Sequence, residues 1–196
     1  MTRRTFLSTP TVFPPRNPDL IEFRKNILLI VVGAFPMRIG MSKIIAEQGQ
    51  LICASPTVVW SRLTQVNQWT QWLTRLKATE LNELPKLHAV GKVTPITGRP
   101  YHFEFSRFDP EAQLQLTRPY KFGTSLIHTY NLTRNAEGVV VSIELSCKGG
   151  LELQVGLLTR RKMARELHDM SVQLKAICEK DQVESAEKLK RLTSAS

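Results

Sequence analysis

Two side chains capable of acid-base chemistry, His128 and Tyr130, stand two positions apart in a segment of alternating apolar and polar residues. The alternation places both on the apolar face of a strand that we expect over Thr124–Thr133. A buried imidazole and a buried phenol each need a hydrogen-bond partner. Two hypotheses stay open. The pair is either satisfied within the core, or it points into a cavity, where it orients a ligand carbonyl or acts as acid and base.

Other patterns that carry chemistry are missing from the sequence. It has no GxSxG elbow, no GxGxxG or P-loop glycines and no HExxH motif, so the usual signatures of nucleotide binding and zinc proteolysis are excluded. Glu104 and Glu144 are acids inside expected strands, and the alternation sends both to the solvent-facing side of the sheet. We therefore predict no metal and no cofactor.

The cysteines indicate a reducing compartment. Cys53, Cys147 and Cys178 are odd in number, far apart and flanked by apolar residues, without a CxxC pair. This pattern is typical of reduced, buried thiols and not of a zinc site. We predict a cytoplasmic protein.

The net charge of +10 does not by itself indicate a nucleic-acid partner. Basic and acidic residues are interleaved, and no basic patch alternates with aromatic residues, so no nucleic acid is expected. A cationic cluster opens the expected long helix, where it opposes the helix dipole. It is interpreted either as a solvated helix face or as a point of weak contact with anionic surfaces. The cluster consists of Arg160, Arg161, Lys162 and Arg165.

The elements that must position His128 and Tyr130 are short strands separated by turn residues. A first strand is expected over Lys43–Ala54. A short helix should follow it, with Ser55 as its N-cap and Pro56 at its first position. A second short helical turn follows around Trp69. The later strands are close in sequence and joined by tight turns, which predicts an antiparallel meander. These strands are expected at Leu73–Leu81, Val90–Ile96, Tyr101–Phe108, Gln113–Thr117, Thr124–Thr133 and Val139–Cys147.

The apolar period becomes helical from about Leu157, with an apolar stripe at steps of four and three. The stripe consists of Met163, Leu167, Met170, Leu174 and Ile177. After Lys180 the composition is polar, and we predict a tail over 181–196. Residues 1–40 are rich in proline and are expected to form a poorly structured N-terminal extension. Their apolar run Ile27–Phe35 is about half the length of a membrane-spanning helix, so no transmembrane span is predicted.

Three segments carry a resemblance to a known family: ICASPTVVWSRLTQVNQWTQW, LHAVGKV and YNLTRNAEGVVVSIELSCKGG. Together they resemble the START-like superfamily, also called SRPBCC, in its polyketide cyclase/dehydrase-like branch. The resemblance covers Ile44 to Lys180, and 41–180 is taken as the domain. It implies an α+β helix-grip fold, in which a curved antiparallel sheet of about seven strands surrounds a long C-terminal helix, with two short helices after the first strand.

The resemblance also implies an apolar pocket between sheet and helix. Its expected lining is Trp72, Phe103, Phe105, Leu116, His128, Tyr130, Met163, Leu167 and Met170. Each of these residues also fits plain core packing, although the flexible methionines suit an adaptable cavity. Three functions stay open. The protein binds a hydrophobic small molecule such as a lipid, sterol-like or polyketide-like compound, or it is an aromatase/cyclase in which His128 or Tyr130 assists proton transfer. Alternatively, its core is filled and it works through its surface.

Overall fold

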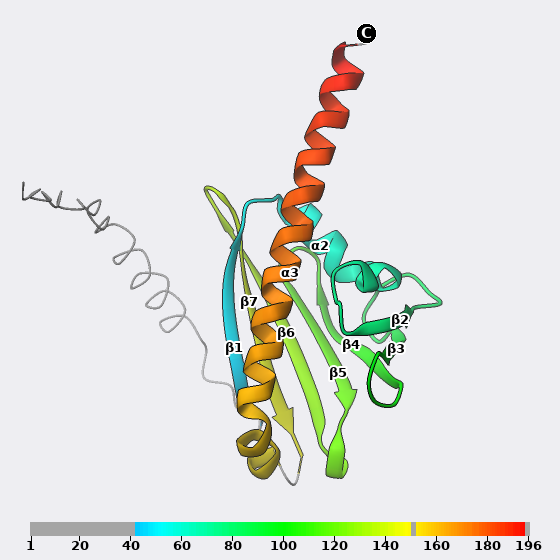
Figure 1. Ribbon diagram of the computed structural model, residues 1–196, viewed down its shortest axis with the longest axis vertical. Helices are drawn as coiled ribbons and strands as arrows, with labels where there is room; N and C mark the ends of the chain where they lie inside the picture. Colours follow the sequence, from blue (N-terminus) through cyan, green and yellow to red (C-terminus); the bar gives the residue numbers. More distant parts are fainter. Residues whose placement is uncertain (1–41, 150–151, 195–196) are drawn as a thin grey trace, which may run out of the picture. The chain divides into compact units, whose positions relative to one another are not determined.

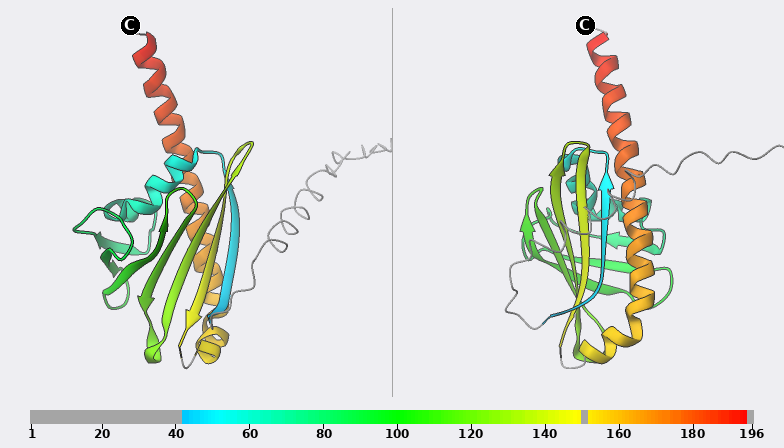
Figure 2. Two further views of the ribbon diagram at one scale, coloured as in Figure 1. Left: turned by 180° about the vertical axis from the view of Figure 1, so that it is seen from behind. Right: turned by 90° about the vertical axis from the view of Figure 1, so that its left-hand side faces the viewer.

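One curved antiparallel sheet of seven strands packs its concave face against a long C-terminal helix (Figure 1). The computed structural model describes residues 42–149 and 152–194. The expectations for residues 1–40 therefore lie outside the described residues. Figure 2 shows the helix running along one face of the sheet and continuing past its end. The predicted helix-grip α+β architecture is confirmed.

The sheet is a meander that the first strand completes by pairing with the last. Its order is β1-β7-β6-β5-β4-β3-β2, and every pair is antiparallel. The strands are β1 (Lys43–Ile52), β2 (Leu76–Glu80), β3 (Val90–Pro95), β4 (Tyr101–Asp109), β5 (Gln113–Pro119), β6 (Ser125–Asn135) and β7 (Gly138–Lys148).

The first helix begins at the predicted cap. Helix α2 (Pro56–Thr64) has Ser55 as its N-cap, and the Ser55 side chain accepts a hydrogen bond of 3.3 Å from the Val58 backbone N–H. Short 3₁₀ helices follow at η1 (Val66–Gln71) and η2 (Lys121–Gly123). Helix α3 (Glu152–Ser194) starts before the predicted Leu157, so the cationic cluster lies two turns inside it rather than at its beginning.

Helix α3 continues beyond Lys180 through the segment expected as a polar tail, and contacts to α2 and to the β1–α2 connection hold it there. Arg62 on α2 forms a two-point ion pair with Asp181, and the Ser55 backbone N–H donates to Gln182 Oε1 over 3.0 Å. Further on, ion pairs between residues four apart, such as Arg191 with Glu187 at 3.7 Å, add local support. The expected tail is therefore helical as far as Ser194.

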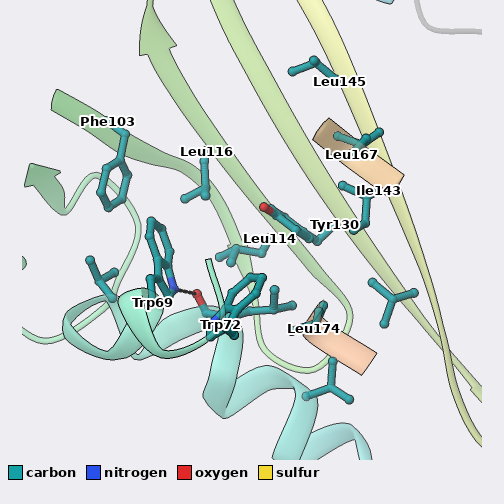
Figure 3. Close-up of a cluster of buried hydrophobic side chains, with 14 of the residues drawn as sticks. Trp69, Trp72, Phe103, Leu114, Leu116, Tyr130, Ile143, Leu145, Leu167 and Leu174 are labelled. Carbon is teal, nitrogen blue, oxygen red and sulfur yellow. Dashed lines mark hydrogen bonds between the residues drawn. The ribbon is translucent and has the colours of Figure 1, made fainter. Parts of the chain in front are cut away.

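The core lies between the concave face of the sheet and α3, and Figure 3 shows part of it, with Ile143 and Leu145 on β7 near Leu167 on α3. On α3, the buried positions Met163, Leu167 and Leu174 follow the predicted stripe. Near α2 the core is aromatic, and the Phe105 and Phe108 rings meet edge to face at 5.7 Å between centroids. Apolar burial of this kind is the main stabilising contribution to such a domain.

Two burial expectations are wrong. Cys53 is exposed because it follows the end of β1, outside the sheet, where its backbone N–H donates to Glu179 Oε1 over 2.9 Å. Glu144 has only 3% of its surface exposed, although its face of β7 is not the concave one. It lies in a central strand between Thr129 on β6 and Glu47 on β1, and alternation alone does not account for that shielding.

Gly91 lies where the backbone of β3 passes close to a core ring. A Cβ at this position on β3 would overlap the buried ring of Phe103, which packs against Trp69 and Phe105. We expect Gly91→Ala to lower the free energy of unfolding by about 1–3 kcal/mol, the usual effect of overpacking a core. Urea denaturation measures it. The matched control is Gly49→Ala on β1, where a Cβ meets nothing within 4 Å, and equal effects at both positions would contradict the prediction.

Candidate functional site

A cavity of about 1140 Å³ lies on the part of the concave face that the core leaves unfilled. Its walls come from β3, β4, β5 and β6, from the first half of α3 and from the loops that lead into β2, β4 and β6. Helix α3 packs mainly on β1 and, to a smaller extent, on β7. The sheet therefore curves away from the helix where the cavity lies.

Most of the expected lining residues meet in this cavity. It is lined by Phe103, Leu116, His128, Tyr130, Met163, Leu167 and Met170. Trp72 and Phe105 do not line it. Phe105 is fully buried because α2 covers its end of the sheet, where Trp60 contacts Phe108. Trp72 faces only a small void of about 20 Å³, beside Leu116 and Tyr130 (Figure 3).

His128 and Tyr130 point to the cavity rather than to protein partners. His128 lines the cavity, and no hydrogen bond of its ring is seen within residues 42–149 and 152–194. The Tyr130 hydroxyl donates only to the Met170 sulfur, over 3.6 Å. A thioether is a weak acceptor. Both polar groups are therefore available to a ligand.

The environment fixes the ionisation of both groups. Burial, with a smaller contribution from the Arg118 cation, lowers the pKa of His128 to about 3. Burial also raises the pKa of Tyr130, and the nearby Tyr101 phenol adds to the effect. Near neutral pH the imidazole is uncharged and the phenol keeps its proton.

Arg118 is a cavity residue that the sequence interpretation missed. It follows Leu114 and Leu116 at every second position of β5, so the same alternation that placed the leucines also assigns it to the concave face. Its guanidinium lies over the ring of Tyr101, 4.5 Å from the centroid, and 5.4 Å from that of Tyr120. Its Nε is buried and finds no hydrogen-bond partner in the part of the chain that the structure describes.

The mouth of the cavity is bridged by polar contacts between α3 and the loop before β2. Arg75 on this loop pairs with Glu166 at 2.6 Å and with Asp169 at 3.3 Å. One turn further along α3, Gln173 donates to the Thr74 hydroxyl over 3.1 Å. These contacts are exposed and individually weak, so they can open without a large cost.

Neither metal chemistry nor a membrane span is indicated in the described parts of the chain. No group of three or more His, Cys, Asp or Glu side chains there is arranged to hold a metal ion. No described helix combines the length and the apolar character needed to cross a bilayer.

Comparison with solved structures places the fold among proteins of varied activity. The di-domain ARO/CYC protein StfQ from the steffimycin biosynthetic pathway matches with a TM-score of 0.58 and 12% identity, over 69% of this chain and 50% of that one. Norcoclaurine synthase of Thalictrum matches with a TM-score of 0.57 and 12% identity, over 74% and 99%. A Staphylococcus aureus protein of unknown function matches with a TM-score of 0.59 and 13% identity, over 71% and 95%. At these identities the likeness shows the fold alone.

Sequence comparison identifies the family. No curated protein matches the chain. The family model described as polyketide cyclase / dehydrase and lipid transport matches residues 43–179, which span the sheet, the cavity and α3 as far as its contact with the Cys53 backbone. The chain belongs to the polyketide cyclase / dehydrase and lipid transport family.

Proposed function

We propose that this protein binds a hydrophobic small molecule, such as a lipid, sterol-like or polyketide-like compound, in the cavity between the sheet and α3. The observation that carries the proposal is the cavity itself, about 1140 Å³ in volume and walled largely by apolar and aromatic side chains. Ligand pockets generally combine such walls with a few polar groups that set orientation. Burial of ligand surface would contribute roughly 25 cal/mol per Å² of apolar area.

The cavity disfavours a purely structural domain. A core filled by side chains leaves voids little larger than a water molecule, whereas this space has room for a ligand of several rings or a long chain. Met163 and Met170 lie on its α3 wall, and flexible thioethers adapt to guests of different shape.

The ionisation of the site favours binding over proton-transfer catalysis. An imidazole with a pKa of about 3 is protonated in roughly one molecule in ten thousand at pH 7, and it is a weak base. A general acid-base catalyst works best with a pKa near the operating pH. His128 and Tyr130 therefore suit fixed hydrogen bonds to a ligand better than the acid-base role of an aromatase/cyclase.

We also propose that the protein is cytoplasmic and that its surface makes weak contacts with anionic surfaces. Within the described residues the thiols of Cys53 and Cys178 form no disulfide, which supports a reducing compartment and hence a cytoplasmic protein. The cationic cluster on α3 is exposed, which supports weak contact with anionic surfaces.

Filling the cavity tests the binding proposal. We expect Met170→Trp, which places a large ring inside the cavity wall, to weaken binding of the uncharged fluorophore N-phenyl-1-naphthylamine at least about tenfold, because the ring occupies ligand space. Fluorescence titration measures the affinity. The matched control is Val172→Trp, at an exposed position on the same helix.

A fluorophore that binds both variants and the wild type equally would contradict the cavity as the binding site. Thermal unfolding of each variant shows whether a loss of binding reflects a loss of folding. Native mass spectrometry of the protein purified from its own host adds an independent test, since a bound compound should appear as an adduct of defined mass.

The lowered pKa of His128 predicts a pH dependence of stability. Below about pH 6.5 the unfolded chain binds a proton at this imidazole and the folded chain does not, so stability falls as pH falls toward about 3. The slope is at most about 1.4 kcal/mol per pH unit. In His128→Gln this part of the slope should vanish.

Urea denaturation at several pH values between about 4.5 and 7 measures the effect, with His102→Gln as the control for loss of an exposed imidazole on the opposite face of β4. If His128→Gln and the wild type lose stability in parallel, His128 is protonated in the folded protein, and an acid-base role becomes the better hypothesis.

A further inference from the structure

We propose that Arg118 binds a carboxylate of the ligand, so that the cavity takes an amphipathic acid rather than a neutral hydrophobic compound. The inference rests on the proposed function and adds the chemical class of the ligand. It starts from a cation inside a largely apolar cavity that no carboxylate of the described residues neutralises.

Two other arginines near the cavity and α3, Arg62 and Arg75, pair with carboxylates, whereas no carboxylate of the described residues pairs with Arg118. Arg62 binds Asp181, and Arg75 binds Glu166 and Asp169 at the mouth. Among residues 42–149 and 152–194, Arg118 contacts the ring faces of Tyr101 and Tyr120, and its buried Nε hydrogen meets no acceptor. Burying such a donor is costly unless a hydrogen-bonding partner is supplied. A ligand in the cavity can supply it.

The two tyrosines prepare the guanidinium for a planar acceptor. A cation stacked over an aromatic ring uses its face, while its N–H donors lie in its plane. Stacking on Tyr101 therefore restrains the orientation of Arg118 without using its hydrogen bonds. A carboxylate matches that arrangement because it accepts two parallel hydrogen bonds from one guanidinium.

The charges around the cavity also favour an anion. Five basic and two acidic side chains line it, and both acids are engaged by Arg75 at the mouth. The remaining basic residues of the lining are Arg99, Arg118, Lys121 and Lys162. An acid would thus be attracted toward the cavity, and only Arg118 among these cations is stacked between tyrosines.

A singly charged group fits better than a phosphate. The polar groups that share the inner lining with Arg118 are His128 and Tyr130, which carry no positive charge near neutral pH. One guanidinium can neutralise one carboxylate, whereas a doubly charged phosphate would also need another cation of the lining, Arg99, Lys121 or Lys162, to reach it. The neutral imidazole and phenol can still donate hydrogen bonds to a carboxylate oxygen.

The test compares an acid with its ester, which differ in charge but hardly in apolar surface. We expect the wild type to bind cis-parinaric acid at least about tenfold more tightly than methyl cis-parinarate, as judged by fluorescence titration near pH 7. Arg118→Met should remove that preference while still binding the ester. Arg118→Lys, which keeps the charge without the planar fork, should retain part of it. The matched control is Arg99→Met, an exposed lining residue whose loss should leave the preference in place.

Each outcome separates this inference from the proposed function. Equal affinity of the wild type for acid and ester would overturn the carboxylate site and leave hydrophobic binding standing. A preference that persists in Arg118→Met would overturn the role of Arg118. Binding of neither probe would count against the proposed function itself. Repeating the comparison with 9-anthracenecarboxylic acid and its methyl ester distinguishes an aromatic ligand body from an aliphatic one, and urea denaturation confirms that each variant folds.

Discussion

One helix cannot cover this sheet, and most of the structure follows from that mismatch. Seven strands spaced about 4.8 Å apart span roughly 29 Å, whereas an α-helix with its side chains is about 10–12 Å across. Helix α3 lies over β1 and β7, and α2 with η1 fills one end of the remaining concave face. Among the described residues no further element covers the rest of that face, and this is where the cavity lies. The cavity is thus a consequence of architecture as much as of individual residues.

The position of α3 is held by polar contacts at the β1 side. The Lys175 ammonium donates to the Leu51 carbonyl oxygen over 2.8 Å and to Glu179, which in turn accepts from the Cys53 backbone N–H. The ion pair of Arg62 with Asp181 fixes the next turn against α2. These contacts give the helix a defined register on β1. With that register set, Met163 and Met170 face the open half of the sheet instead of the closed half.

The sequence predicts the sheet well because apolar and polar residues alternate within each strand, and this pattern can be read without knowing the neighbouring strands. The positions of Phe103, Leu116 and Tyr130 follow from counting by two along β4, β5 and β6, without knowledge of their partners. Other features depend on what lies opposite in space. Phe105 has the same parity as Phe103, but α2 covers it, and the sequence of β4 contains no sign of that cover. The end of α3 up to Ser194 lacks the apolar stripe that indicates a packed helix, although its residues are strong helix formers.

The alternation in β5 also predicts on which face of the sheet Arg118 lies, but not what it contacts. Its parity is available from the sequence, but a charged residue at the end of a strand is more often solvated, and only the structure brings the Tyr101 and Tyr120 rings to it. Once there, it has two effects on the cavity. It helps keep His128 uncharged, and it leaves an unpaired donor among apolar walls. The site keeps His128 uncharged and retains the cation of Arg118. This arrangement suits one anionic group held at Arg118. Arg118 therefore contributes to the low basicity of His128 and also offers the hydrogen-bond donor on which the proposed carboxylate site rests.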